Sequence, residues 1–281
     1  MIKIIVDSGC DISQEKAKKL GIKVLPLEVA FGEERYLDGV TLTGEAFYKK
    51  LGASSLSPKT SQINAYAYGQ AFEEEFSQGN EVLCITLSSK LSGCYQSANL
   101  AKSSASMPVE VVDSLNVSLG EASLVYAALS YIDKGLDLKT VAEKLRALTG
   151  RVKVFALLDT LEFLRRSGRI SKAVAFLGEA LGFKPIVTTK EGAVCLAGKS
   201  LGRKSAPIVL KRLIEKCGGP DEESPVLAAF GGAPKEDFSL FLKQIGLKIL
   251  NKENSSYQIG AAIGSHVGPG AMEIAFLTKG D

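Results

Sequence analysis

The sequence predicts an α/β protein with two domains, and three observations support this prediction. In the first half, short apolar segments alternate with polar turns and segments of helical periodicity, which is typical of a mostly parallel sheet with helices on both faces. In the second half, some apolar segments follow one another across tight turns, which favours partly antiparallel strands. The length of 281 residues allows two cores of moderate size. We place the domains at residues 1–150 and 151–281.

The first domain is predicted to alternate strands and helices up to about residue 134. Asp11 is the expected N-cap of the first helix, because a carboxylate accepts hydrogen bonds from the free amides of a first turn. Thr43 and Asn64 are expected to cap later helices in the same way. The predicted strands are residues 2–6, 23–31, 35–37, 82–86 and 109–112; the later helices are residues 43–51, 64–76, 95–102 and 118–134; residues 57–61 are a loop.

The second domain is predicted to contain a hairpin and several short strands. A turn at Lys190-Glu191-Gly192 joins the hairpin strands 184–189 and 193–197. The other predicted strands are residues 152–158, 226–230, 256–261 and 272–278, and the predicted helices are residues 160–166, 171–181, 205–216 and 235–242.

Composition argues against several classes of function. Hydrophobic residues make up 46% of the chain and charged residues 23%, as in ordinary globular proteins. The net charge of +3 gives no indication of a nucleic-acid partner. With one histidine and five cysteines that form no C-x-x-C pair, we expect neither a metal site nor a cofactor.

The apolar segments are short. The N-terminal run is too short for a signal peptide, and no uninterrupted run is long enough to span a bilayer. We therefore expect a cytoplasmic protein without stable membrane insertion.

The single histidine is the most informative residue. His266 lies within residues 263–271, where Gly264, Gly268 and Gly270 together with Pro269 predict an irregular backbone. An imidazole on such a loop is free to face a ligand.

Two further polar segments lie far upstream of His266. They are Thr60-Ser61-Gln62 and Ser88–Gly93, and the second follows a predicted strand. In a parallel sheet, the loops after the carboxyl ends of the strands form the ligand crevice. Hydroxyl groups and one imidazole can hold a small anionic or polar group without a metal ion. Each segment alone fits an ordinary turn, but together with His266 they predict a binding site.

An alternative function depends on Ser200. Residues 198–202, Gly-Lys-Ser-Leu-Gly, match the G-x-S-x-G motif of serine hydrolases and lie between a predicted strand and a predicted helix. Asp221 or Asp237 followed by His266 would preserve the order of such a triad. A serine hydrolase or esterase using Ser200 and His266 is therefore the alternative, although no HGGG-type oxyanion segment is present.

An arginine-rich segment ends one of the predicted helices. Arg165, Arg166 and Arg169 surround Gly168, and three arginines exceed what capping a helix C-terminus needs. Planar guanidinium groups suit phosphate or carboxylate recognition, so we predict a docking surface for an acidic partner, which Arg203 extends.

Several of these segments occur together in one order along the chain. They are Val6-Asp7-Ser8 with Asp11, Lys59-Thr60-Ser61-Gln62, Ser89-Lys90-Leu91-Ser92-Gly93, Val112-Asp113-Ser114 with Ser118, Thr160–Ile170, Lys184-Pro185-Ile186 and Ile263–Ala271. In this order they resemble the DegV family of bacterial fatty-acid-binding proteins over nearly the whole chain.

The resemblance implies a Rossmann-like N-terminal sheet with flanking helices and a C-terminal α/β domain that buries lipid. It implies that one long-chain fatty acid is bound with its carboxylate at the domain interface. A separate ATP-dependent kinase would convert this acid to an acyl phosphate for phospholipid synthesis, so the protein itself would not be the enzyme. By position, Thr60, Ser92 and His266 would bind the carboxylate, Ser61, Gly93 and Ser118 would flank it, and Arg165, Arg166, Arg169 and Arg203 would lie where the kinase docks.

Three positions depart from the family pattern. Cys94 stands where threonine is common, and Ile63-Asn64 replaces a common Pro-Ser or Pro-Ala. Glu121 replaces a neutral residue, and its charge would repel a carboxylate if the side chain faced the site.

Overall fold

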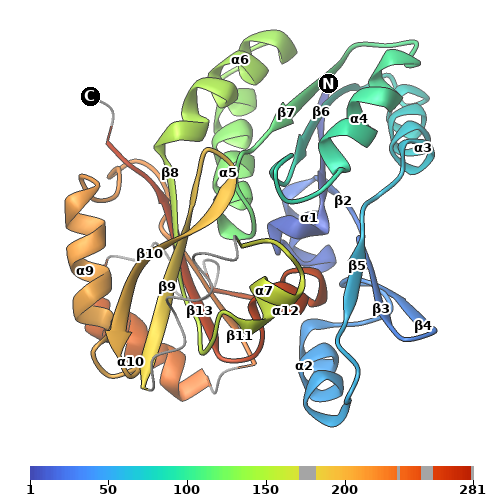
Figure 1. Ribbon diagram of the computed structural model, residues 1–281. Coiled ribbons are helices and arrows are strands. Elements are labelled where there is room, and N and C mark those ends of the chain that lie inside the picture. The colour runs from blue at the N-terminus through green and yellow to red at the C-terminus, as the bar shows by residue number, and fades with distance from the viewer. Residues whose placement is uncertain (171–181, 233–234, 248–255, 280–281) are drawn as a thin grey trace.

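The structure is a computed structural model that describes residues 1–170, 182–232, 235–247 and 256–279. Within these ranges the strands form a four-stranded, a six-stranded and a three-stranded sheet. The two larger sheets stand side by side, and the helix Leu119–Asp133 (α5) lies between them and contacts both (Figure 1). The predicted helix at residues 171–181 lies outside the described residues.

The four-stranded sheet is wholly parallel, as predicted for the first half. Its strands are β1 (Ile2–Asp7), β2 (Lys23–Leu25), β6 (Glu81–Thr86) and β7 (Val109–Asp113), in the order β2-β1-β6-β7. Helices α3 (Ala65–Phe76) and α4 (Cys94–Ser103) cover one face, and α5 and α6 (Leu138–Leu148) cover the other. Alternate residues therefore enter different cores: Ile4 and Val6 pack toward α5, and Ile5 packs toward α3.

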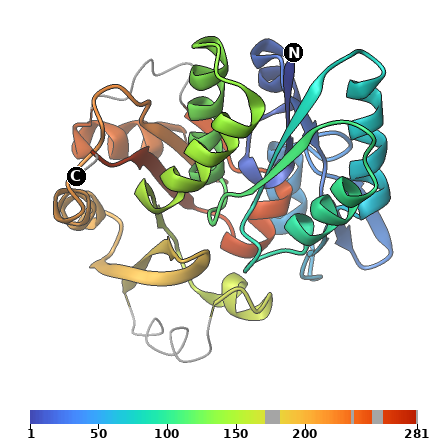
Figure 2. The ribbon, with the colours of Figure 1, turned by 90° about the horizontal axis from the view of Figure 1, so that it is seen from above.

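The six-stranded sheet is mixed, and this confirms the partly antiparallel character expected of the second half. Its strands are β8 (Val152–Leu157), β9 (Phe183–Lys190), β10 (Ala193–Leu201), β11 (Leu227–Gly231), β12 (Ser256–Gln258) and β13 (Ala271–Leu277), in the order β10-β9-β8-β13-β11-β12. Only the β11–β12 pair among them is parallel. Helices α9 (Ala206–Lys216) and α10 (Lys235–Ile245) pack on the face away from α5 (Figure 2).

The three-stranded sheet was predicted in part, because strands were expected at residues 23–31 and 35–37 but not at residues 59–61. It consists of β3 (Glu28–Phe31), β4 (Glu34–Leu37) and β5 (Lys59–Ser61), in the order β4-β3-β5. The predicted strand 23–31 is divided at Pro26, which has no amide hydrogen for a ladder, so its first part joins the parallel sheet instead. The predicted loop 57–61 is wrong at its end, because residues 59–61 pair with β3 and Thr60 lies opposite Val29.

The segment around His266 is a helix, which corrects the expectation of an irregular loop. Helix α12 (Ala261–Val267) carries His266 in its last turn. Gly264 serves helix packing rather than a turn: a Cβ there would lie 2.6 Å from Cε1 of Phe47 and 2.8 Å from the hydroxyl oxygen of Tyr48. Both rings belong to α2 (Gly44–Ala53), so glycine permits the close approach of the two helices.

Asp11 is also not the helix cap that we predicted. Ser13 caps α1 (Gln14–Leu20), whereas Asp11 is buried in the left-handed conformation after a short 3-10 helix at Ser8–Cys10 (η1). Its carboxylate accepts hydrogen bonds from the Gly260 amide, at 2.7 Å, and from the Ser118 hydroxyl. Asp11 therefore joins the N-terminal part of the chain to the start of α12.

Other buried carboxyl groups hold the loops at the carboxyl edge of the parallel sheet. Asp7 accepts from the amides of Leu87 and Gly9, and Asp38 accepts from the Ala261 amide at 2.8 Å and from the Ser8 hydroxyl at 2.8 Å. Helices α7 (Glu162–Arg166) and α12 pack together beside this edge. No helix in the described ranges is long and apolar enough to cross a membrane.

The buried acids predict how stability changes with pH. Burial raises the pKa of Asp7 to about 7, and burial likewise raises the pKa of Glu273, on β13, to about 7. Since both pKa values lie above those of an unfolded chain, the folded state holds more protons, and stability is lost as pH rises through 7. Between about pH 6.5 and pH 8, we expect chemical denaturation to show a loss of about 1 kcal/mol for each group.

An opposing effect is confined to the lower part of this pH range. Burial lowers the pKa of His266 to about 4, so the unfolded chain, whose histidine has an ordinary pKa of about 6.5, binds the extra proton, and this contribution is complete by about pH 7.5. A free energy of unfolding that rises between these two pH values would contradict the prediction, and Glu273→Gln should show a smaller loss than the wild type.

Candidate functional site

A cavity of about 220 Å³ lies where the carboxyl edge of the parallel sheet meets the six-stranded sheet and α12. One wall comes from the loops after β2, β6 and β7 and from β5, and the opposite wall comes from β8, β9, β10 and β13. Its lining is largely aliphatic, with Leu27, Leu87, Leu91, Val117, Val154 and Ile263 among the residues that face it.

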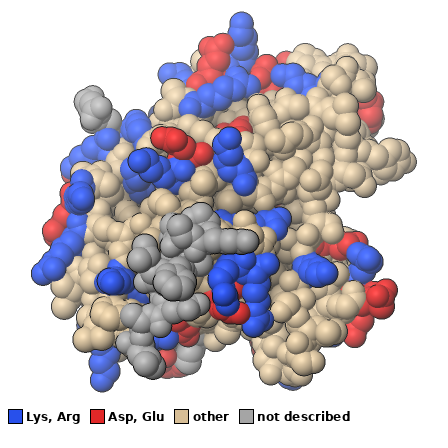
Figure 3. Space-filling view, viewed as in Figure 1, with Lys and Arg blue, Asp and Glu red and all other residues tan. Residues whose placement is uncertain are grey.

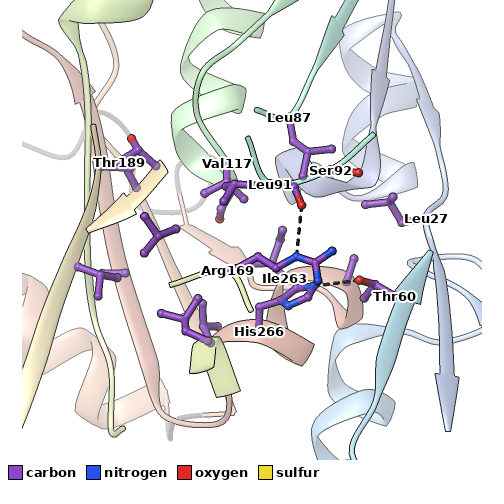
Figure 4. Close-up of a pocket in the computed structure, with 18 of the residues that line it drawn as sticks. Leu27, Thr60, Leu87, Leu91, Ser92, Val117, Arg169, Thr189, Ile263 and His266 are labelled. Carbon is purple, nitrogen blue, oxygen red and sulfur yellow. Dashed lines mark hydrogen bonds between the residues drawn. The ribbon is translucent and has the colours of Figure 1, made fainter. Parts of the chain in front are cut away.

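Polar side chains gather at one end of this cavity. Thr60 Oγ1 lies 2.9 Å from Nε2 of His266, across 206 positions of sequence. Ser92 and Arg169 face the same end (Figure 4). The structure therefore brings together Thr60, Ser92 and His266, the three residues that the sequence analysis assigned to a head group.

The local backbone explains how Thr60 and Ser92 reach the cavity. Pairing with β3 fixes β5, and one face of β5 is turned toward α12. Ser92 belongs to the turn before α4, where it donates to Sγ of Cys94 at 3.3 Å. Gln62 packs directly on Gly93, since a Cβ at Gly93 would lie 1.8 Å from Oε1 of Gln62. Glycine at position 93 leaves room for the Gln62 side chain, which donates to the Ser97 hydroxyl at 3.0 Å.

Electrostatics keep the imidazole of His266 neutral. Burial and, secondly, the positive charge of Arg169 lower the pKa of His266 to about 4. Its Nε2 is paired with Thr60, and its Nδ1 is buried without a hydrogen-bond partner among the described residues. A neutral ring next to a guanidinium group forms a polar end with one permanent positive charge.

The four arginines assigned to partner docking occupy different environments. Arg169 lines the cavity and donates to the carbonyls of Leu91 and Ser167, so its position near the head-group residues was missed. Arg165 and Arg166 lie on α7, where both pair with Glu162, and roughly half of each side chain is exposed. Arg203 pairs with Asp159 and donates to the carbonyl of Gly270.

Charged side chains are concentrated near α7 on this face of the molecule. Figure 3 shows several Lys and Arg side chains close to the position of α7 in Figure 1. Lys184 and Arg203 both pair with Asp159, so part of the local positive charge is neutralised.

The residues predicted to flank the site also line the cavity. Ser61, Gly93 and Ser118 all face it. Ser118 has φ 54° and ψ −129°, a strained conformation for a residue other than glycine, and its hydroxyl donates to Asp11. Glu121 is fully buried and is not among the residues that line the cavity, so the repulsion considered for it does not arise there.

The structure does not support the Ser200 alternative. Ser200 lies within β10 rather than on a turn between a strand and a helix, and its side chain is buried. Its hydroxyl donates to the carbonyl of Gly202 at 2.9 Å, while Nε2 of His266 is paired with Thr60. The nucleophile and base of a hydrolase are therefore not assembled.

Two comparisons of sequence identify relatives over the full length. The sequence profile of the DegV family, which is described as a family of uncharacterised proteins, matches residues 1–279. A DegV domain-containing protein of Clostridium acetobutylicum is 31% identical, and the match covers 99% of each chain. A DegV domain-containing protein of Deinococcus radiodurans is 32% identical over 98% of this chain and 97% of the other.

Solved structures show the same architecture. A DegV family protein of Thermus thermophilus, described by its fatty acid binding, has a TM-score of 0.89 and 31% identity, covering 98% of this chain and 99% of the other. A stearic acid-binding protein of Eubacterium ventriosum has a TM-score of 0.88 and 29% identity, covering 99% of each chain. These matches confirm the predicted fold class and the predicted family. The chain belongs to the DegV family.

Proposed function

We propose that this protein binds one long-chain fatty acid in the cavity, with the carboxylate at the end formed by Thr60, Ser92 and His266. The observation that carries the proposal is a largely aliphatic cavity with hydroxyl groups, an imidazole and one guanidinium group gathered at one end. The relatives from Thermus thermophilus and Eubacterium ventriosum, which are described as binding fatty acids, support it.

The aliphatic and polar parts of the cavity match the two parts of a fatty acid. Each methylene group that leaves water contributes about 0.8 kcal/mol, so a long acyl chain drives binding. A carboxylate cannot be buried without partners, and the Thr60 and Ser92 hydroxyls provide donors. Arg169, which was predicted to lie outside the site, adds a positive charge at the same end that balances the negative charge of the carboxylate.

We further propose that the protein is a carrier whose ligand is phosphorylated by a separate ATP-dependent kinase. The acyl phosphate would then enter phospholipid synthesis. The hydroxyl groups at the polar end would hold the carboxylate while leaving one oxygen for phosphoryl transfer. Arg165 and Arg166, which are partly exposed on α7, together with Arg203, would contact acidic residues of that kinase.

The same proposal includes the organisation and location of the protein. Residues 1–150 and 151–281 would be its two domains, with the parallel sheet in the first and the six-stranded sheet in the second. All five cysteines are free thiols, which suits function in the cytoplasm.

Removal of either hydroxyl should weaken fatty acid binding. We expect Thr60→Val and Ser92→Ala each to cost about 1–3 kcal/mol, because a carboxylate would lose a hydrogen-bond donor in a buried site. Titration calorimetry of delipidated protein with stearate would measure the loss. Ser200→Ala is the control, because it removes a buried hydroxyl group that does not line the cavity, and this variant should bind stearate as the wild type does. Unchanged affinity in both site variants would remove Thr60 and Ser92 from the proposed role.

Loss of the α7 arginines should slow phosphorylation without changing ligand affinity. Arg165→Gln combined with Arg166→Gln is expected to lower the rate of acyl phosphate formation by a bacterial fatty acid kinase at least about tenfold, since two cationic contacts are lost. Arg146→Gln on α6, with a similarly exposed side chain, is the control. A normal rate in the double variant would contradict the docking assignment, and no acyl phosphate with the wild type would contradict the carrier role.

A further inference from the structure

The wall formed by the six-stranded sheet presents a carboxyl group to the cavity. Glu273 lies on β13, its residue is 3% exposed, and it lines the cavity together with Ala156 and Val187. The head-group residues lie on β5, on α12 and in the turn before α4. Glu273 belongs to the opposite wall, so it would face the acyl chain of the proposed ligand rather than the carboxylate.

Strand register places small residues on both sides of Glu273. Residues 273, 156 and 187 lie in one row across β13, β8 and β9, and Ala229 on β11 lies beside Glu273 on the other side. Directly paired residues share one face of a sheet. Both immediate neighbours in the row are alanines, so neither of them separates the carboxyl group from the cavity that Glu273 lines.

Capping of α5 accounts for only part of this group's hydrogen-bonding capacity. The Leu119 amide donates to Oε1 of Glu273 at 3.0 Å, and the Ser118 hydroxyl, which donates to Asp11, also lies within hydrogen-bonding reach of this carboxyl group. A carboxylate offers about four acceptor positions. Capping explains why a hydrogen-bond acceptor is needed at the N-terminus of α5. The Glu273 carboxyl group still has acceptor positions that a ligand could use.

An unsubstituted acyl chain is a poor neighbour for Glu273. Such a chain would displace water from the carboxyl group and offer no hydrogen bond to replace those that the water had made. A hydroxyl group on the chain offers a donor and an acceptor, and burial, which raises the pKa of Glu273 to about 7, makes both forms of the acid available near neutral pH. Sites built around a ligand hydroxyl discriminate strongly against analogues that lack it.

We propose that this protein selects fatty acids that carry a hydroxyl group on the acyl chain, with Glu273 as the specificity-determining residue that hydrogen-bonds the hydroxyl. The inference rests on the proposed function, because it assumes an acyl chain in the cavity. It assigns the ligand to a narrower chemical class than the long-chain fatty acids in general.

Competition between stearate and monohydroxystearates tests this inference. Delipidated wild-type protein is titrated with stearate and with a series of hydroxystearates that differ in the position of the hydroxyl. We expect at least one of them to bind about tenfold more tightly than stearate, and the preference to be confined to neighbouring hydroxyl positions, because Glu273 is fixed in the wall. Equal or weaker binding of every hydroxystearate, or an equal preference at all positions, would overturn the inference.

Two variants identify the residue responsible. In Glu273→Met, the ratio of the affinity for the preferred hydroxystearate to the affinity for stearate should fall to about one, because the apolar side chain cannot form a hydrogen bond with the hydroxyl group. Glu121→Gln is the matched control, since it replaces another fully buried carboxyl group that does not line the cavity, and it should keep the wild-type ratio. A folded Glu273→Met variant that keeps the wild-type ratio would overturn the assignment. Wild-type protein that binds neither stearate nor hydroxystearate would instead contradict the proposed function, so the two failures can be told apart.

Discussion

The attachment of helix α12 to the first half of the chain determines the geometry of the site. Asp11 and Asp38 accept hydrogen bonds from the amides of Gly260 and Ala261, at the beginning of the helix. Both carboxyl groups are buried, so these bonds are shielded from water and are stronger than they would be at the surface. This attachment places His266, one helix length further on, beside Thr60. Without it, the polar end of the cavity would lose its imidazole.

The cavity itself follows from the choice of residues on two opposing walls. On the six-stranded sheet, the short side chains of Ala156 and Val187 line the cavity and leave space in front of β8 and β9. On the other wall, Leu27, Leu87 and Leu91 come from loops held by the hydrogen bonds of Asp7 and its neighbours. Buried carboxyl groups thus position the loops, and aliphatic side chains from those loops form the surface that a lipid would contact.

Much of the fold and of the polar end could be predicted from the sequence. Alternating apolar runs and N-caps located the parallel sheet and helices such as α2 and α3, because those signals are local. The helical state of residues 261–267 could not be read locally, because Gly264 makes room for the rings of Phe47 and Tyr48, which come from a distant segment. Strand β5 and the position of Arg169 likewise depend on contacts with distant segments. Glu273 was missed, although the alternation of β13 indicated that it shares a face with Ala271 and Ala275.

The proposed function requires a carboxylate that lies between Thr60 and Ser92 while its hydrocarbon chain runs along the six-stranded sheet. A crystal structure of the protein loaded with stearate or a hydroxystearate measures this arrangement directly. We predict carboxylate oxygens within hydrogen-bond distance of both hydroxyl groups and carbon atoms in contact with Ala156 and Val187. A lipid bound with its carboxylate at the opposite end of the cavity, or bound outside it, would contradict the account.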